Sequence, residues 1–222
     1  MNYFAKARKY GLTPANIISW LSLQSMAHLG KWPGTIALHV KARLLGVQLG
    51  KNVVAHGPVG LLRWPGGHIT IGDNTKIISS WRRATASALA FPTRLRVFGP
   101  GASIEIGEGC ELSGASITAR STRISLGKGV LVGPNCVIID SDFHAPWPPN
   151  QRSVSPGVER DAPVTIGDYA WLGLNSIILK GVSIGNGCII GAGSVVTRDI
   201  PDNCLACGSP CKVVRVYGGY DA

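Results

Sequence analysis

Aliphatic residues recur every six positions in the last third of the chain. Between residues 164 and 196, the hexads open on Ile166, Leu172, Ile178, Ile184, Ile190 and Val196. Four positions after each of the first five openers stands a small or β-branched residue, namely Ala170, Ser176, Val182, Cys188 and Ser194. This period fits neither the 3.6-residue turn of a helix nor the two-residue alternation of an uninterrupted strand. It is typical of a parallel β-helix, a prism whose short strands turn a corner every six residues and point each opener inward.

The same spacing can be followed back towards the N-terminus, with interruptions. Openers in phase are Leu126, Val132 and Ile138, then Ile106 and Leu112, then Ile71 and Ile77, and more weakly Leu49, Ala55 and Leu61. Two insertions, 79–97 and 139–163, break the run and must leave the prism as loops, which is where functional residues concentrate. We therefore predict a mainly β chain with a helical cap over 1–46, a β-helix over 47–205 that carries these loops, and a C-terminal tail over 206–222.

Two helices are expected before the first turn of the prism. Residues 14–29 read as a helix with Thr13 as its N-cap and Pro14 at its first position. A second helix is expected over 35–45. Asn, Gln and Ser interrupt the first helix long before the roughly 20 apolar residues that would cross a bilayer. We expect both helices to cover the open end of the prism, because solenoids need caps.

Charge is distributed unevenly along the chain. The net charge is +10, and no acidic residue precedes Asp73, whereas eight Lys and Arg residues do. Basic amphipathic helices bind the anionic face of a membrane, so a peripheral position at the inner membrane is compatible with the capping role. No nucleic-acid partner is expected, because the basic residues are not interleaved with an aromatic platform and no binding motif is present.

The six cysteines do not read as a disulfide framework. Three of them fall on the small interior position of the repeat, namely Cys110, Cys136 and Cys188. A thiol packs there as a small hydrophobe. Cys204, Cys207 and Cys211 have the spacing C-x2-C-x3-C but lack a fourth Cys or His nearby, so we expect no metal. Free thiols and the lack of a signal peptide predict a cytoplasmic setting.

The loop after Ile138 holds the best candidate for chemistry, because it brings His144 close to Asp140 and Asp142. A histidine with an unperturbed pKa of about 6.5 is available as a general base at neutral pH. A carboxylate beside it would fix the tautomer and stabilise the imidazolium, so we expect Asp142 or Asp140 in that role. The other histidines have no comparable surroundings and are expected on the surface or in local hydrogen bonds; they are His28, His39, His56 and His68.

Five motifs in the second half of the chain have a familiar order and spacing. They are VGPN at 132–135, DFH at 142–144, IGDYAWLG at 166–173, IGAGSVVTRDIP at 190–201 and GSPCKVVR at 208–215. With them, the stretch from Ile124 to Arg215 resembles the hexapeptide-repeat acyltransferases. It is most similar to the branch of galactoside, maltose, nodulation-factor and surface-polysaccharide O-acetyltransferases. The resemblance covers about 90 residues closely and residues 47–123 only as a looser repeat.

The resemblance implies a left-handed β-helix and an acetyl-CoA-dependent O-acetyltransferase, active as a homotrimer with each site between neighbouring prisms. His144 falls on the family's catalytic histidine, which takes a proton from the acceptor hydroxyl during direct acetyl transfer. The backbone N–H at Gly173 and Leu174 falls on the position that stabilises the oxyanion. The positions that hold coenzyme A and its phosphates correspond to Ala192, Thr197, Arg198, Lys212 and Arg215. Trp171 also stands at a family position, and we expect it to pack in the core.

The acceptor stays open at this point. The family's sugar acetyltransferases have an asparagine one turn earlier, whereas residues 113–115 contain none. We expect a sugar hydroxyl of a surface polysaccharide or glycan precursor, with antibiotics and amino sugars as alternatives. A non-catalytic trimeric scaffold is a further alternative. A carbonic anhydrase of the γ type is disfavoured, because it needs three histidines on one zinc and only His144 lies in the second half of the chain. The insertion 79–97 is either an acceptor-side or membrane-side arm or a protruding loop.

Overall fold

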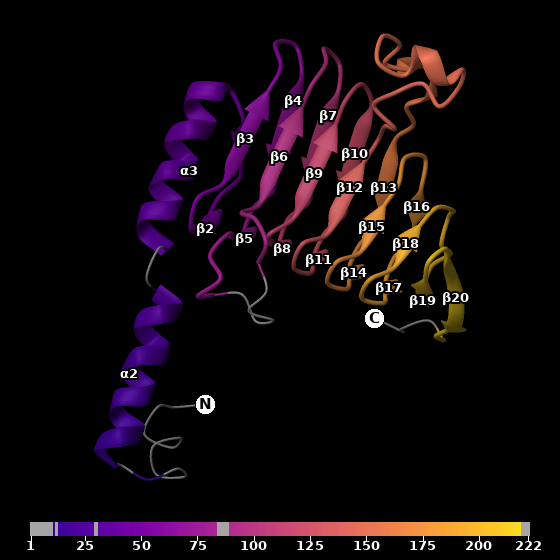
Figure 1. Ribbon diagram of the computed structural model, residues 1–222. Coiled ribbons are helices and arrows are strands. Elements are labelled where there is room, and N and C mark those ends of the chain that lie inside the picture. The colour runs from indigo at the N-terminus through magenta and orange to yellow at the C-terminus, as the bar shows by residue number, and fades with distance from the viewer. Residues whose placement is uncertain (1–10, 12, 29–30, 84–88, 219–222) are drawn as a thin grey trace.

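The computed structural model describes residues 11, 13–28, 31–83 and 89–218. The chain winds through three sheets, A, B and C, which form the sides of a triangular prism (Figure 1). Consecutive turns of the prism pair in parallel, and the last two strands of sheet B, β19 and β20, pair antiparallel. The predicted fold class, a left-handed parallel β-helix with N-terminal helices and a protruding loop, is confirmed.

The strands follow one another in the order A, B, C in every turn. Sheet A contains β1 (Gln48–Leu49), β4 (His68–Ile71), β7 (Ser103–Ile106), β10 (Arg123–Leu126), β13 (Val164–Ile166) and β16 (Ser183–Ile184). Sheet B contains β2 (Val54–His56), β5 (Lys76–Ile78), β8 (Glu111–Ser113), β11 (Leu131–Val132), β14 (Trp171–Leu172), β17 (Ile189–Ile190), β19 (Cys204–Gly208) and β20 (Cys211–Val216). Sheet C contains β3 (Gly60–Arg63), β6 (Arg94–Val97), β9 (Ser116–Ala119), β12 (Val137–Ile139), β15 (Ile177–Ile178) and β18 (Val195–Val196).

The interior of the prism is built from the two positions that the repeat predicts. The six openers from Ile166 to Val196 are at most 2% exposed, and so are the small residues four positions later. The hydroxyl of Ser176 donates to the carbonyl oxygen of Gly173 at 2.6 Å, so this interior serine is satisfied by the corner. Cys110, Cys136 and Cys188 are fully buried. Burial raises the pKa of the Cys136 thiol to about 11, which suits a packing role.

Each full turn becomes shorter along the prism. In sheet A the chain takes 22 residues from Gln48 to its partner in the next turn, 20 from Ile104 and 18 from Thr165. The strands shrink in parallel, from four residues in β7 and β10 to two in β14 to β18. Only the last turns therefore consist of three hexads, which explains why the repeat is clearest there.

Two predicted boundaries move in the structure. The first insertion ends before β6, because residues 94–97 pair with β3 and β9 as a strand of sheet C. At the other end, β19 and β20 form a hairpin that extends sheet B, and β19 pairs with β17. Residues 206–216, which we expected in a tail, therefore lie in the sheet.

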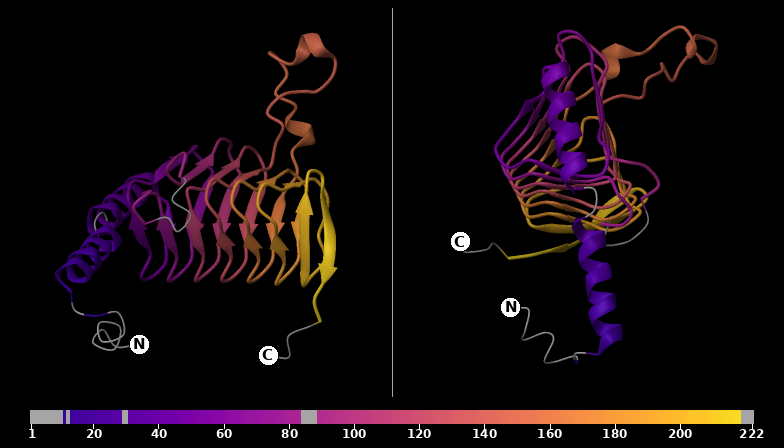
Figure 2. Two further views of the ribbon diagram at one scale, coloured as in Figure 1. Left: turned by 60° about the horizontal axis from the view of Figure 1, so that its bottom comes forward. Right: turned by 90° about the vertical axis from the view of Figure 1, so that its left-hand side faces the viewer.

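The two N-terminal helices have different environments. In α2 (Pro14–His28), the backbone N–H of Asn16 donates to the hydroxyl of Thr13 at 3.2 Å, which confirms the predicted N-cap. The second helix, α3 (Lys31–Leu45), begins four residues earlier than expected and lies across the open end of the prism (Figure 1). Gly34 permits this close packing, because a Cβ there would lie 2.7 Å from the carbonyl oxygen of Ala55. Helix α2 instead projects beyond the prism (Figures 1 and 2), so only α3 caps it.

The two insertions leave the prism at different corners. Residues 79–93 run from sheet B to sheet C, whereas residues 140–163 run from sheet C to sheet A. The second insertion stands well out from the prism (Figure 2) and contains two short 3-10 helices, η1 (Pro149–Gln151) and η2 (Val158–Arg160). No helix among the described residues is long and apolar enough to cross a membrane.

Candidate functional site

His144 lies on the projecting loop, on the outgoing arm of the hairpin-like excursion 140–163. Its Nδ1 lies 2.7 Å from the carbonyl oxygen of Arg152, and the backbone N–H of Ala145 donates to the carbonyl oxygen of Ser155 at 3.0 Å. These two bonds tie the outgoing arm to the returning one. A carbonyl oxygen only accepts, so in the neutral ring Nδ1 carries the proton and Nε2 keeps its lone pair. The His144 side chain is exposed, which leaves Nε2 accessible as a base.

The carboxylates that we expected beside His144 are engaged elsewhere. Asp142 forms an ion pair with Lys180 at 2.5 Å, on the corner after β15. Asp140 is fully buried and accepts hydrogen bonds from the backbone N–H groups of residues 120, 121 and 122 and from the Thr122 hydroxyl. Among the residues that the structure describes, the carbonyl of Arg152 therefore does the orienting that we assigned to a carboxylate. Asp140 and Asp142 instead fix the root of the loop to the turns on either side of it.

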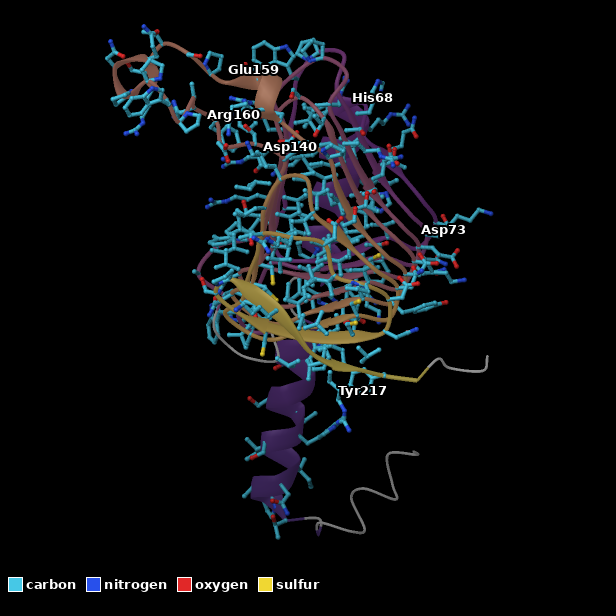
Figure 3. All side chains as sticks on the ribbon, turned by 90° about the vertical axis from the view of Figure 1, so that its right-hand side faces the viewer. His68, Asp73, Asp140, Glu159, Arg160 and Tyr217 are labelled. Carbon is cyan, nitrogen blue, oxygen red and sulfur yellow. The ribbon has the colours of Figure 1, made fainter. Side chains whose placement is uncertain are left out.

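Arg120 anchors both arms of this loop, and we did not predict it from the sequence. Its guanidinium makes a two-pronged bond to Asp161 at 2.6 and 2.8 Å, donates to the carbonyl oxygen of Pro156, and lies over the ring of Phe143 at 5.6 Å. It thus contacts the outgoing arm next to His144 and the returning arm at two places. The arms also meet at the base of the loop, where the N–H of Ala162 donates to the carbonyl oxygen of Asp140 at 3.0 Å; Asp140 is labelled in Figure 3. The side chain of Arg120 is 11% exposed and that of Asp161 is fully buried.

The environment of Asp161 keeps its carboxylate charged. Burial alone would raise the pKa of Asp161, but hydrogen bonds from Arg120, Ser121 and Ser141 outweigh it, so that the pKa lies below its usual value. A charged, two-pronged pair of this kind is geometrically specific as well as strong. It holds the returning arm against the corner after β9.

The second group of candidates lies on the corner between sheets B and C. The N–H of Gly173 is used by the ladder, donating to Ile190 at 2.7 Å. The N–H of Leu174 makes no hydrogen bond among the described residues, so it is the donor at this corner that a ligand oxygen could use. Ala192 stacks directly below, since a Cβ on Gly173 would lie 2.6 Å from its backbone nitrogen. Glycine is required at position 173 for this close stacking.

The predicted phosphate-binding residues are exposed but do not share one corner. Lys212 pairs with Cys207 of the closing hairpin, beside the corner that contains Ala192. Arg215 lies further along β20, where its guanidinium covers the ring of Tyr217 at 5.4 Å. Arg198 and Thr197 follow β18, at the corner between sheets C and A. None of the three cations forms an ion pair with an acid of the described residues, so their charge is available to an anion.

Trp171 does not lie where we expected it, and the end of the first insertion makes a contact that we did not predict. Trp171, which we expected in the core, points outward from sheet B and is 50% exposed, because it precedes the inward opener Leu172. The end of the first insertion folds along the same corner as Leu174. There the N–H of Ala90 donates to the side-chain oxygen of Asn135 at 2.9 Å, and the Asn135 amide lies 3.3 Å from the side-chain oxygen of Asn175.

The candidates therefore form two groups that one side of the prism separates. His144 and Asp142 lie at the corner between sheets C and A, as do Thr197 and Arg198. Leu174 and Ala192 lie at the corner between sheets B and C, with Lys212 beside it on β20. Within one chain, sheet C lies between them. Among the described residues, no group of three His, Cys, Asp or Glu side chains is placed to hold a metal ion.

Comparison with known proteins agrees with the repeat. Residues 163–198 match the model of the hexapeptide repeat of succinyl-transferase. These residues form the last turns of the prism, where the six-residue period is strictest. A predicted acetyltransferase of Staphylococcus aureus (strain MRSA252) is 40% identical over 109 residues, which cover 42% of this chain and 55% of that protein. A predicted acetyltransferase of Schizosaccharomyces pombe (strain 972 / ATCC 24843) is 44% identical over 92 residues, 41% of this chain and 42% of that protein. The chain spans about half the length of the curated relatives that it matches.

Solved structures share the fold of this chain. The polysialic-acid-specific acetyltransferase NeuO superposes with a TM-score of 0.51 at 21% identity, covering 79% of this chain and 85% of that one. A hexapeptide-repeat acetyltransferase of Vibrio cholerae O1 biovar eltor, solved with acetyl coenzyme A, gives 0.52 at 20% identity and covers 89% and 84%. At these identities the likeness shows the fold.

Proposed function

We propose that this protein is an acyltransferase that moves an acetyl group from acetyl-CoA to a sugar hydroxyl, with His144 as general base. The observation that carries the proposal is the bond from Nδ1 to the Arg152 carbonyl, which leaves Nε2 of an exposed imidazole as a proton acceptor. A hydroxyl is a poor nucleophile unless a base removes its proton as it attacks, and a positioned histidine typically contributes 10²–10⁴-fold to such a step.

In this mechanism His144 first accepts a proton and then donates it. Nε2 takes the proton of the acceptor hydroxyl as the oxygen attacks the acetyl carbonyl. The resulting imidazolium returns it to the departing sulfur, so no covalent enzyme intermediate forms. The N–H of Leu174 stabilises the negative charge that develops on the carbonyl oxygen, a role that typically contributes about 3 kcal/mol. Asp142 acts here by fixing the loop through Lys180 and not by contact with the imidazole.

The residues that would hold acetyl-CoA fit an anionic, extended ligand. Acetyl-CoA supplies the acetyl group and a thiolate leaving group. Ala192 and Thr197 would line its arm. The unpaired cations that would bind its phosphates are Arg198, Lys212 and Arg215, which are all exposed. Their placement at different points of the last turn suits a long ligand better than a single compact anion.

The separation of the two groups supports an assembly in which copies complete one another's sites. The loop that carries His144 stands far out from its own prism, so it is placed to reach the Leu174 corner of a neighbour (Figure 2). A closed cyclic homotrimer would form three such sites between adjacent prisms. The end of the first insertion contacts Asn135 on the same edge of the prism, one turn before Leu174, and would form the acceptor side of each site. We propose a cytoplasmic location for the reaction.

The experiment that tests the proposal measures thiol release from acetyl-CoA, with wild type and His144→Ala and a panel of free and lipid-linked sugars, amino sugars and aminoglycosides. Release that requires both an acceptor and His144 supports the transferase. The matched control is His68→Ala, an exposed histidine on β4 outside the candidate site. If coenzyme A does not bind, the enzyme hypothesis is wrong and a scaffold role takes its place. If it binds and an amino sugar or aminoglycoside is the acceptor, the assigned substrate class is wrong.

A further inference from the structure

Helix α3 has two opposite faces, and only one of them is covered. Gly34, Leu38 and Ala42 are buried against the first turn of the prism. On the other side, every fourth residue is a large apolar side chain, and all four are more than half exposed: Trp32 (71%), Ile36 (60%), Val40 (54%) and Leu44 (80%). At about 100° per residue, this stripe is centred opposite the buried one. The helix is therefore apolar on both sides, and one side faces solvent.

Helix α2 also exposes apolar side chains. Ile17, Ile18 and Leu21 are 42%, 66% and 53% exposed. Helix α2 extends from the end of α3 away from the prism (Figure 1). Single exposed apolar residues are normal, but a four-residue stripe along α3 with further exposed apolar residues on the adjoining helix marks an interaction surface, which we call the apolar strip.

The charge around this strip indicates which partner covers it. Residues 1–104 contain thirteen of the 22 Lys and Arg residues but only one of the 12 acidic residues, Asp73. Next to the strip, Arg43 is exposed and the Lys31 ammonium lies 5.9 Å from the centre of the Trp32 ring. An apolar strip with tryptophan in a strongly basic part of the chain complements an anionic lipid surface, where apolar groups enter the acyl boundary and cations meet the headgroups.

We propose that the apolar strip of α3 and α2 docks this protein on an anionic membrane, with the prism standing away from the bilayer. The orientation follows from the fold, because α3 lies across the end of the prism and its exposed face looks outward along the prism axis (Figures 1 and 2). In a cyclic trimer whose prisms run side by side, the three strips would lie at the same end, and three weak contacts would reinforce one another.

The orientation also sets the height of the candidate site. Four strand spacings of about 4.8 Å separate β1 from β13 in sheet A, so the His144 loop stands roughly 20 Å from the docking end. This point rests on the proposed function: it favours an acceptor sugar carried some distance above a lipid anchor over one at the headgroup.

Vesicle sedimentation of the full chain tests the docking. The probe is phosphatidylglycerol in phosphatidylcholine vesicles, against phosphatidylcholine alone. The test variant is Ile36→Ser with Leu44→Ser, two exposed positions whose change leaves the buried face of α3 intact. The matched control is Val214→Ser with Val216→Ser, which are 58% and 69% exposed on β20 at the far end of the prism. We expect wild type and control to bind the anionic vesicles, and the α3 variant to bind about tenfold or more weakly.

Two results would overturn the inference. The first is wild type that stays in the supernatant, or an α3 variant that binds as well as wild type. The second is a concentration-dependent dimer of the assembly, seen by light scattering and lost in the α3 variant without any vesicle binding, which would assign the strip to a second copy. Thiol release with a soluble acceptor, unchanged in the α3 variant, separates this inference from the proposed function.

Discussion

The early and late turns of the prism bury the same kind of core with different amounts of chain. Early turns without an insertion take 22 residues from Gln48 and 20 from Ile104, with strands of up to four residues, whereas the turn from Thr165 takes 18 residues, with strands of two. Residues 1–104 carry all the excess positive charge, because residues 105–222 contain nine Lys and Arg against 11 acidic residues. His144 and the corner of Leu174 and Ala192 belong to the later part. The difference teaches that turns with longer strands can hold extra residues, whereas a turn of three hexads with two-residue strands has no residue to spare.

The sharpest test of this comparison replaces one inward-facing leucine by alanine in a late turn and one in an early turn. Leu172→Ala removes a fully buried side chain from a short turn and should lower the free energy of unfolding by about 3–4 kcal/mol. Leu61→Ala, at a half-buried opener of the first turn, should cost about 1–2 kcal/mol, because part of the side chain is already hydrated. Urea unfolding of both variants measures this, and equal losses would mean that the early turns are packed as tightly as the late ones.

Inserting one residue tests directly whether a turn of the prism can hold an extra residue. A glycine inserted after Gly187 enters an 18-residue turn, at a corner where even a Cβ would lie 2.6 Å from the Asn203 side chain. We expect a loss of about 2–3 kcal/mol, because the extra residue must either displace that contact or shift the inward residues. The same insertion after Gly66, in a longer corner, should cost about 0.5 kcal/mol. Thermal unfolding of the pair measures the difference, and similar midpoints would refute the idea of strict spacing.

Arg120 connects the two parts, since it belongs to a long turn and holds the loop of His144. Arg120→Gln should lower kcat by about 10–100-fold and leave KM for acetyl-CoA unchanged, because the loop loses its anchor while the corner of Leu174 is untouched. Arg120→Lys should restore less than half of the loss, since an ammonium cannot make the two-pronged bond. A loss of the folded state, seen by circular dichroism, or a rise in KM alone would contradict a positioning role.

Acid should act on the later part first, because Asp73 is the only acidic residue before Glu105. The pKa of Asp161 is lowered in the folded chain, so its contribution is complete above the unfolded value of about 3.9 and is lost as the pH falls through the lowered folded value. We expect pepsin to cut the 140–163 loop increasingly over that window while the early turns stay intact. In Asp161→Asn the cutting should no longer depend on pH in this range, and an unchanged dependence would assign the effect to another carboxylate.

The smallest effect concerns thiols. Burial raises the pKa of Cys110, Cys136 and Cys188, which lie in long and short turns alike, whereas Cys207 is exposed on the closing hairpin. Iodoacetamide should therefore modify one thiol per folded chain, at Cys207, as mass spectrometry of peptides would show. Early labelling of Cys188 but not Cys110 would mean that the short turns open locally.

The sequence predicted the inward positions well, because each opener faces the interior whatever the length of its turn. It placed β6 in a loop, since residues 94–97 follow an insertion and resume out of phase. The partners of the site were harder to foresee. Asp142 meets Lys180 38 residues later and Arg120 meets Asp161 41 residues later, and both pairs depend on how many residues each turn uses. Had the 20-residue turn been known, the stacking of Asp140 on residues 120–122 would have followed from it.

The reversal of the chain at Gly208 also limits growth. A stack of parallel strands ends in an unpaired edge that can template the next strand, which is how fibrils lengthen. In sheet B that edge belongs to β20, which runs against all the strands before it. A second copy arriving head to tail would offer β2 in the wrong direction to continue the parallel ladder. At the other end α3 lies across the opening. Helix α3 at one end and the antiparallel strand β20 at the other thus oppose the end-to-end stacking of prisms into a longer fibre.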